Sequence, residues 1–254
     1  MTVADVVAAL ALPSAAMVNQ RVAKQMLADN AAATAADKRS ILDGIDEIQW
    51  LAALKPSNIG VPEFRDDTRA YLELAVLSLS VRTGAKTARL VELVHRAIPY
   101  PVLLIVHAED GLALSLAHIR QAQNEADKTV LDGESVLATI PADSIGQSFL
   151  QAMALPRQPR GDLFSLYQGW IDTVVSLEAA QVTGHFILST TREQARIRRT
   201  ALQQCRAINL SIVGLQKAAK KEKQLARQVT VNLEIKRLET ELLAAQTFLT
   251  QGTQ

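Results

Sequence analysis

The sequence predicts an α+β fold, in which a small mixed β-sheet packs with helices and a long C-terminal helical coiled-coil arm follows. Three observations support this prediction. Apolar and small polar residues alternate along residues 71–82, the period of a half-buried strand. An amphipathic stripe over residues 86–98 and a continuous apolar run over 101–107 then indicate a helix and a central strand. From residue 192 onward the chain has no proline, and apolar residues recur at three- and four-residue steps.

Shorter elements are expected before the strand at 71–82. Residues 3–10 and 36–45 have helical patterns, and residues 45–51 fit either a helix end or the start of a strand. Pro56 ends that segment because proline donates no backbone hydrogen bond. A charged loop with a proline covers residues 62–67.

A hairpin is expected after the apolar run. The Asp110-Gly111 step is typical of a tight turn between paired strands. Alternating leucines extend the second strand to residue 119, and a weak edge strand is expected within 128–140.

Three regions follow from this order. An α/β body covers residues 1–155, and residues 156–190 form a linker and a helix that packs on the body through Tyr167 and Trp170. A basic coiled-coil helical arm covers residues 191–254.

Two apolar stripes with coiled-coil spacing run along the arm. Their frames do not align, so either one helix contains a stutter or two helices meet at a turn near Val229-Thr230. Such a stripe needs a partner, which is the arm's own second helix, the body or another copy of the chain. The expected interface residues are Ile208, Ile212, Leu215, Val231, Ile235, Leu238 and Leu242.

Charge is distributed unevenly along the chain. The formal net charge is +1, but residues 191–237 carry twelve cations and three acids, so this segment is +9 and the remainder is −8. Such asymmetry favours an acidic partner, either nucleic acid or an acidic protein surface. The alternative is a solvated helix that neutralises the body. The candidate binding residues are Arg196, Arg198, Arg199, Lys217, Lys220, Lys221, Lys223, Arg227, Lys236 and Arg237.

Nucleic-acid binding by this arm is expected to be sequence-independent and sensitive to salt. Phe248 is its only aromatic residue after Phe186, so the contacts are to phosphates and not to stacked bases.

Several classes of protein are not expected. The longest apolar run is too short for a membrane span, and the apolar N-terminus lacks the basic start of a signal peptide, which predicts a bacterial cytoplasmic protein. A single cysteine excludes an internal disulfide framework. The chain has no glycine-rich phosphate loop and no catalytic signature, so we expect no cofactor, no metal and no enzymatic activity.

One acidic cluster carries an alternative function. Glu63, Asp66, Asp67 and Glu73 lie close together in sequence before and at the start of the 71–82 strand, as in the Mg²⁺ sites of restriction-type nucleases. Glu109 is the candidate carboxylate from the next strand, although no lysine follows it. This hypothesis predicts a metal-dependent nuclease or DNA-binding module.

A small anion site is a further possibility in the body. Its members would be five polar and basic residues: Asn19, Arg21, Lys24, Arg96 and Arg120.

Four stretches carry a family resemblance. They are VNQRVAK at 18–24, IDEIQW at 45–50 with Lys55-Pro56, IPYPVLLI at 98–105 and KEKQLARQVTVNLEIKRLE at 221–239. Together they resemble the bacterial family known as domain of unknown function 4391, over nearly the whole chain. The resemblance implies a protein often encoded beside a helicase and a DNA methyltransferase in anti-phage defence clusters, and it implies no catalytic residues.

These observations favour an accessory interaction or assembly subunit of a restriction-modification-like defence system. Its expected partners are the helicase or DNA methyltransferase of the same cluster, DNA, and a second copy of the chain through the coiled coil.

Overall fold

The chain forms two compact units in a computed structural model, which describes residues 1–31, 34–123 and 125–251. The units are Met1–Val174 and Val175–Gln254. Helix α7 (Leu163–Thr183) begins in the first unit and ends in the second.

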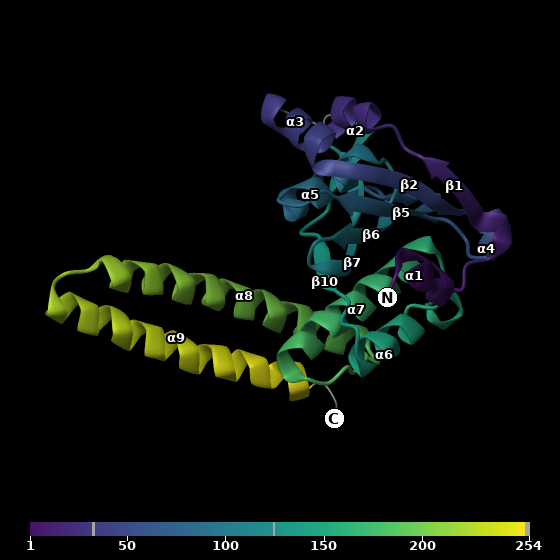
Figure 1. Ribbon diagram of the computed structural model, residues 1–254. Helices are drawn as coiled ribbons and strands as arrows, with labels where there is room; N and C mark the ends of the chain where they lie inside the picture. The colour runs from purple at the N-terminus through teal and green to yellow at the C-terminus, as the bar shows by residue number, and fades with distance from the viewer. Residues whose placement is uncertain (32–33, 124, 252–254) are drawn as a thin grey trace. The chain divides into compact units, whose positions relative to one another are not determined.

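A mixed six-stranded sheet forms the centre of the first unit (Figure 1). Only β5 and β6 run parallel, and every other neighbouring pair is antiparallel. Helix α5 (Thr87–Ala97) connects the parallel pair, as a parallel crossover requires. The strands, in spatial order, are β1 (Met17–Arg21), β2 (Ile45–Leu54), β5 (Leu74–Val81), β6 (Val102–Ala108), β7 (Gly111–Leu116) and β10 (Val136–Thr139).

Helices cover both faces of this sheet (Figure 1). Helices α2 (Lys24–Ala31), α3 (Ala35–Gly44) and α5 pack on one face, where alternate residues of β5 and β6 such as Leu77 and Leu104 are buried. The other face meets α1 (Val3–Leu10) and the first part of α7, and α6 (Ser144–Ala152) packs against α1. Burial on both faces explains why β6 is a continuous apolar run.

Short elements complete the first unit. Two small antiparallel pairs join β3 (Phe64–Arg65) to β4 (Ala70–Tyr71) and β8 (Ile119–Ala122) to β9 (Glu125–Leu131). A short helix α4 covers Pro56–Ile59, and two 3-10 turns, η1 and η2, cover Ser14–Ala16 and Leu155–Arg157.

The α+β fold class and the core of the predicted order are confirmed. The expected helix at 86–98 is α5, the apolar run is the central strand β6, and the helix at 162–182 is α7 with Tyr167 and Trp170 fully buried.

Some expected boundaries were wrong. The strand expected at 71–82 is β5 and begins at Leu74, because Tyr71 pairs with Phe64 in a separate ribbon. The strand expected to reach residue 119 ends at Leu116, since Ile119 starts β8 in another sheet. The segment at 45–51 is a strand and not a helix end.

Two antiparallel helices dominate the second unit. Helices α8 (Arg192–Lys221) and α9 (Leu225–Gln251) lie side by side (Figure 1). Residues 222–224 connect them, so the arm is a helical hairpin whose turn lies before the expected Val229-Thr230. Within the described residues, no helix combines the length and apolar character needed to cross a membrane.

Candidate functional site

Side-chain hydrogen bonds to the backbone mark both ends of α8. At the start of α8, Thr191 Oγ1 accepts a hydrogen bond from the Gln194 amide at 3.1 Å. At its end, Glu222 adopts an extended conformation, and its Oε1 accepts a hydrogen bond from the Gln224 amide at 2.8 Å. This local hydrogen bond orders a turn that reverses the chain. We refer to α8, the turn and α9 as the arm.

The two predicted apolar stripes lie within the arm. On α8, Ile208 and Ile212 are buried and Leu215 is half-buried. On α9, Ile235 is buried, while the other predicted interface residues, Val231, Leu238 and Leu242, are half-buried. Because α8 and α9 are antiparallel neighbours, these residues form the shared apolar face of one hairpin, and each helix is the other's partner.

Arg198 lies inside the second unit and not on a binding surface. Its Nη1 donates hydrogen bonds to Ser176 Oγ at 2.9 Å, Ile187 O at 2.7 Å and Ser189 Oγ at 2.9 Å. The guanidinium therefore fixes the segment between α7 and α8. No sequence pattern indicates this role, since Arg198 lies among other arginines.

Other arginines of the arm are held in ion pairs. Arg196 contacts Glu193 at 2.6 Å, and Arg237 contacts Glu241 at 3.1 Å. Arg206, which was not among the candidate residues, pairs with Glu178 at the end of α7. Burial raises the pKa of Glu178, and the charge of Arg206 opposes that shift.

The remaining cations gather at the turn of the hairpin. Residues 217–227 contain five cations and one acid, Glu222. All five side chains are exposed, and within the described part of the chain none of them pairs with a carboxylate. We call this group the basic turn: Lys217, Lys220, Lys221, Lys223 and Arg227.

The basic turn is a local excess of positive charge. Lys220 and Lys221 lie in the last turn of α8, where the helix dipole favours cations by only about 0.3–1 kcal/mol each. Mutual repulsion of five cations opposes that gain, so an external anion would stabilise the cluster. Lys236 is a further exposed cation on α9, and Arg199 on α8 is half-buried.

The predicted acidic cluster is divided among separate ion pairs. Glu63 contacts Arg65 at 3.1 Å, and Glu73 contacts Lys55 at 3.2 Å. Asp66 accepts hydrogen bonds from the backbone amides of Thr68 and Arg69, which lower the pKa of its carboxyl.

Glu109 lies at the opposite end of the sheet from Glu73. Glu73 precedes β5 and Glu109 follows β6, and the parallel register places Glu109 level with Arg82. The separation along the strands is ~30 Å. Within residues 1–31, 34–123 and 125–251, no three His, Cys, Asp or Glu side chains are grouped to hold a metal ion.

The five residues of the predicted anion site have different surroundings. Lys24 Nζ donates to the carbonyls of Leu42 and Ile45 at 3.2 and 3.0 Å, where it secures the end of α3. Arg21 lies 3.8 Å from Glu47, and Arg96 lies 2.6 Å from Glu92 on its own helix.

Asn19 and Arg120, the other two members of that set, also lie apart. Asn19 has φ +51° on the edge strand β1. Arg120 lies in β8, 3.9 Å from Asp132.

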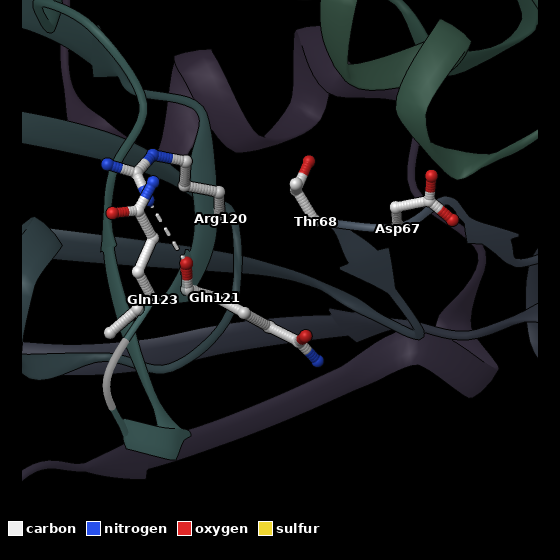
Figure 2. A pocket seen from close by; sticks show the side chains of 6 residues that line it. Asp67, Thr68, Arg120, Gln121 and Gln123 are labelled. Carbon is white, nitrogen blue, oxygen red and sulfur yellow. Dashed lines mark hydrogen bonds between the residues drawn. The ribbon is translucent and has the colours of Figure 1, made fainter.

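Arg120 instead borders an open pocket of about 520 Å³ in the first unit. Figure 2 shows Asp67 and Thr68 on one side, and Arg120, Gln121 and Gln123 from β8 and the residue after it on the other. The Gln121 amide donates to the Thr68 carbonyl at 2.8 Å, which joins the two sides. Asp67, a member of the predicted acidic cluster, thus lines this pocket, and its neighbours there are neutral or basic.

Two histidines take part in hydrogen bonds that the sequence did not predict. His118 Nδ1 lies 2.6 Å from the Tyr71 hydroxyl, and its Nε2 lies 2.9 Å from Gln168 Oε1. Burial raises the pKa of Tyr71, so its phenol stays protonated. The Tyr71 side chain is fully buried, which makes this a structural connection between β4 and α7 and not a reactive group. His95 is buried elsewhere, on α5.

A family model described as "Domain of unknown function (DUF4391)" matches residues 10–242 of the chain. No curated protein matches the chain, and no solved structure matches it.

Proposed function

The chain belongs to the DUF4391 family, and on that premise we propose that it is an accessory subunit of a bacterial anti-phage defence system whose arm binds nucleic acid. The family model covers both the body and most of the arm, so the arm is part of what defines the family. The basic turn is the observation that carries the proposal.

The chemistry of the basic turn suits phosphates. Its lysines are flexible point charges, and they would neutralise phosphates without reading bases. No aromatic residue lies within residues 217–227, so base stacking contributes nothing there. Binding would therefore be independent of sequence and would weaken with salt.

The family resemblance supplies the proposed setting. In the bacterial cytoplasm, the subunit would act beside a helicase and a DNA methyltransferase, with the arm holding DNA or an acidic face of one of these enzymes. Co-purification of the full chain with each enzyme tests this setting. Failure to bind either one would contradict the role as a subunit.

Charge reversal tests the role of the basic turn. Lys217→Glu, Lys220→Glu, Lys221→Glu and Lys223→Glu are combined, and binding of a labelled DNA duplex is followed by fluorescence anisotropy. We expect affinity to fall about tenfold or more at low salt, because several phosphate contacts are lost.

A control reverses three exposed cations elsewhere, one fewer than the basic-turn variant. Arg39, Lys86 and Arg157 are exposed cations of the first unit, and their combined reversal to Glu should leave most of the affinity intact. Equal losses in the two variants would show that only net charge matters. Loss of folded structure in the basic-turn variant would show that the turn stabilises the arm instead.

A further inference from the structure

Large apolar side chains are exposed on α9. Leu225, Val229, Leu233 and Leu243 are between 51% and 75% exposed. Together with Lys236 and Thr240 they follow steps of four, four, three, four and three residues, which places them on one face of a helix. We call this face the outer ridge: Leu225, Val229, Leu233, Lys236, Thr240 and Leu243.

The outer ridge is distinct from the face that meets α8. That inner face carries Val231, Ile235, Leu238 and Leu242, which are buried or half-buried. Helix α9 is thus apolar on two faces but is covered on only one. A helix with apolar residues on opposite sides normally packs between two neighbours.

The net charges of α9 and α8 differ, and this difference makes α9 the better surface for binding a second copy of the chain. Residues 225–251 carry three cations and three acids, so α9 is neutral. Residues 192–221 carry eight cations and one acid, so α8 is +7. Two copies of α9 can approach each other without net repulsion, whereas two copies of α8 cannot.

We propose that the outer ridge binds the outer ridge of a second copy, with the two α9 helices antiparallel. A two-fold axis near residue 234 would place Leu225 opposite Leu243 of the second copy, and the reverse. Leu233 and Lys236 would both lie beside the axis, and the long stem of Lys236 would carry its ammonium group from there to solvent. The two hairpins would form a row of four helices in the order α8, α9, α9 and α8, because the two apolar faces of α9 lie on opposite sides of the helix.

The dimer would also affect DNA binding, and this part of the inference rests on the proposed function. The turn of each hairpin lies eleven residues from the axis, so the two basic turns would be ~33 Å apart. That spacing is close to one helical turn of B-DNA, roughly 34–36 Å. Two basic turns would then contact the same face of one duplex.

Light scattering after gel filtration of the full chain tests the interface. We expect the wild type to have twice the mass of one 27.6 kDa chain. The combined Leu233→Glu and Leu243→Glu variant should have the mass of one chain and an unchanged helical circular dichroism signal.

Leu210 provides the matched control, because it is 75% exposed but lies on α8. Leu210→Glu should keep the dimeric mass. A monomeric wild type, or a dimer that survives Leu233→Glu and Leu243→Glu, would overturn the proposed interface. A monomeric wild type would leave a membrane surface or a helix of another protein as the occupant of the ridge.

The two proposals fail separately. The ridge variant keeps the basic turn of each chain, so it should still bind DNA, although more weakly than the dimer. Conversely, the basic-turn variant should remain dimeric while its affinity for DNA falls. Loss of the dimer in the basic-turn variant would contradict the assignment of the interface to the ridge.

Discussion

His95 Nε2 lies 2.9 Å from Ser115 Oγ, and both side chains are buried between α5 and β7. Burial lowers the pKa of His95 to about 4, so the imidazole is neutral in the folded protein at pH 7. In the unfolded chain the same group has a pKa of about 6.5. The folded state therefore binds fewer protons than the unfolded state between these two values.

This difference predicts an acid-sensitive stability. Below about pH 6.5 the unfolded chain gains a proton that the folded protein excludes, so stability falls as the pH falls towards 4. The loss attributable to His95 is about 2 kcal/mol between pH 7 and pH 5. Urea unfolding at the two pH values measures it, and His95→Gln should reduce the difference. The exposed His107→Gln is the control, and an equal effect there would contradict the assignment.

The Tyr167 hydroxyl joins three chain segments. It donates to the Val102 carbonyl at 2.7 Å and accepts from the Ala117 amide at 3.0 Å, in a fully buried position. Tyr167→Phe leaves both backbone groups without that partner, and we expect the free energy of unfolding to fall by about 1–3 kcal/mol. Denaturant unfolding measures the change. Tyr100 is half-buried, and Tyr100→Phe should lower the free energy of unfolding much less. Equal losses in the two variants would argue against the hydrogen bonds as the cause.

Arg198 is predicted to stabilise the second unit and not to bind DNA. Arg198→Met removes the hydrogen bonds that a charged donor makes to Ser176, Ile187 and Ser189, so we expect a loss of roughly 2–3 kcal/mol in unfolding free energy. At a temperature where the variant remains folded, its DNA affinity should match the wild type. The exposed Arg192→Met should leave stability unchanged. A stable Arg198→Met protein with weakened DNA binding would contradict this prediction and would indicate that Arg198 contacts DNA.

Leu238 is predicted to hold the hairpin together. Its half-buried side chain lies on the face of α9 that meets α8, so Leu238→Asp places a carboxylate in an apolar contact. We expect a loss of roughly 2 kcal/mol or more and faster proteolysis within the arm. Leu210→Asp changes the same residue type on an exposed face and should be tolerated. Equal proteolysis of the two variants would contradict the assigned faces.

Periodicity predicted those elements that are buried in a regular way. The alternation in β5, the stripe on α5 and the apolar run of β6 each reflect the side chains that meet the core. Strand β1 was not predicted, because four of its five residues are exposed and polar residues occupy its end. Its pairing with β2 depends on backbone hydrogen bonds, which leave no pattern in the side chains.

The positive charge of the candidate site could be predicted from the sequence, but the positions of its side chains could not. The excess of cations in the arm is visible in the sequence, but the burial of Arg198 depends on Ser176 and Ser189, which lie in other segments. The shift between the two apolar stripes left open a stutter in one helix or a turn between two helices, and the structure has the turn. The position of the turn was missed by several residues because its cause, the bond between Glu222 and Gln224, is a local side-chain contact. The connection between Tyr71 and His118 spans 47 residues and has no sequence signal.

The salt dependence of DNA binding tests the central claim most directly. For the wild type, the logarithm of the association constant should fall against the logarithm of salt concentration with a slope of about −4, if most of the basic turn neutralises phosphates. Reversal of Lys217, Lys220, Lys221 and Lys223 should bring that slope close to zero. No binding of duplex DNA by the wild type at low salt, or the same slope in both proteins, would contradict the account.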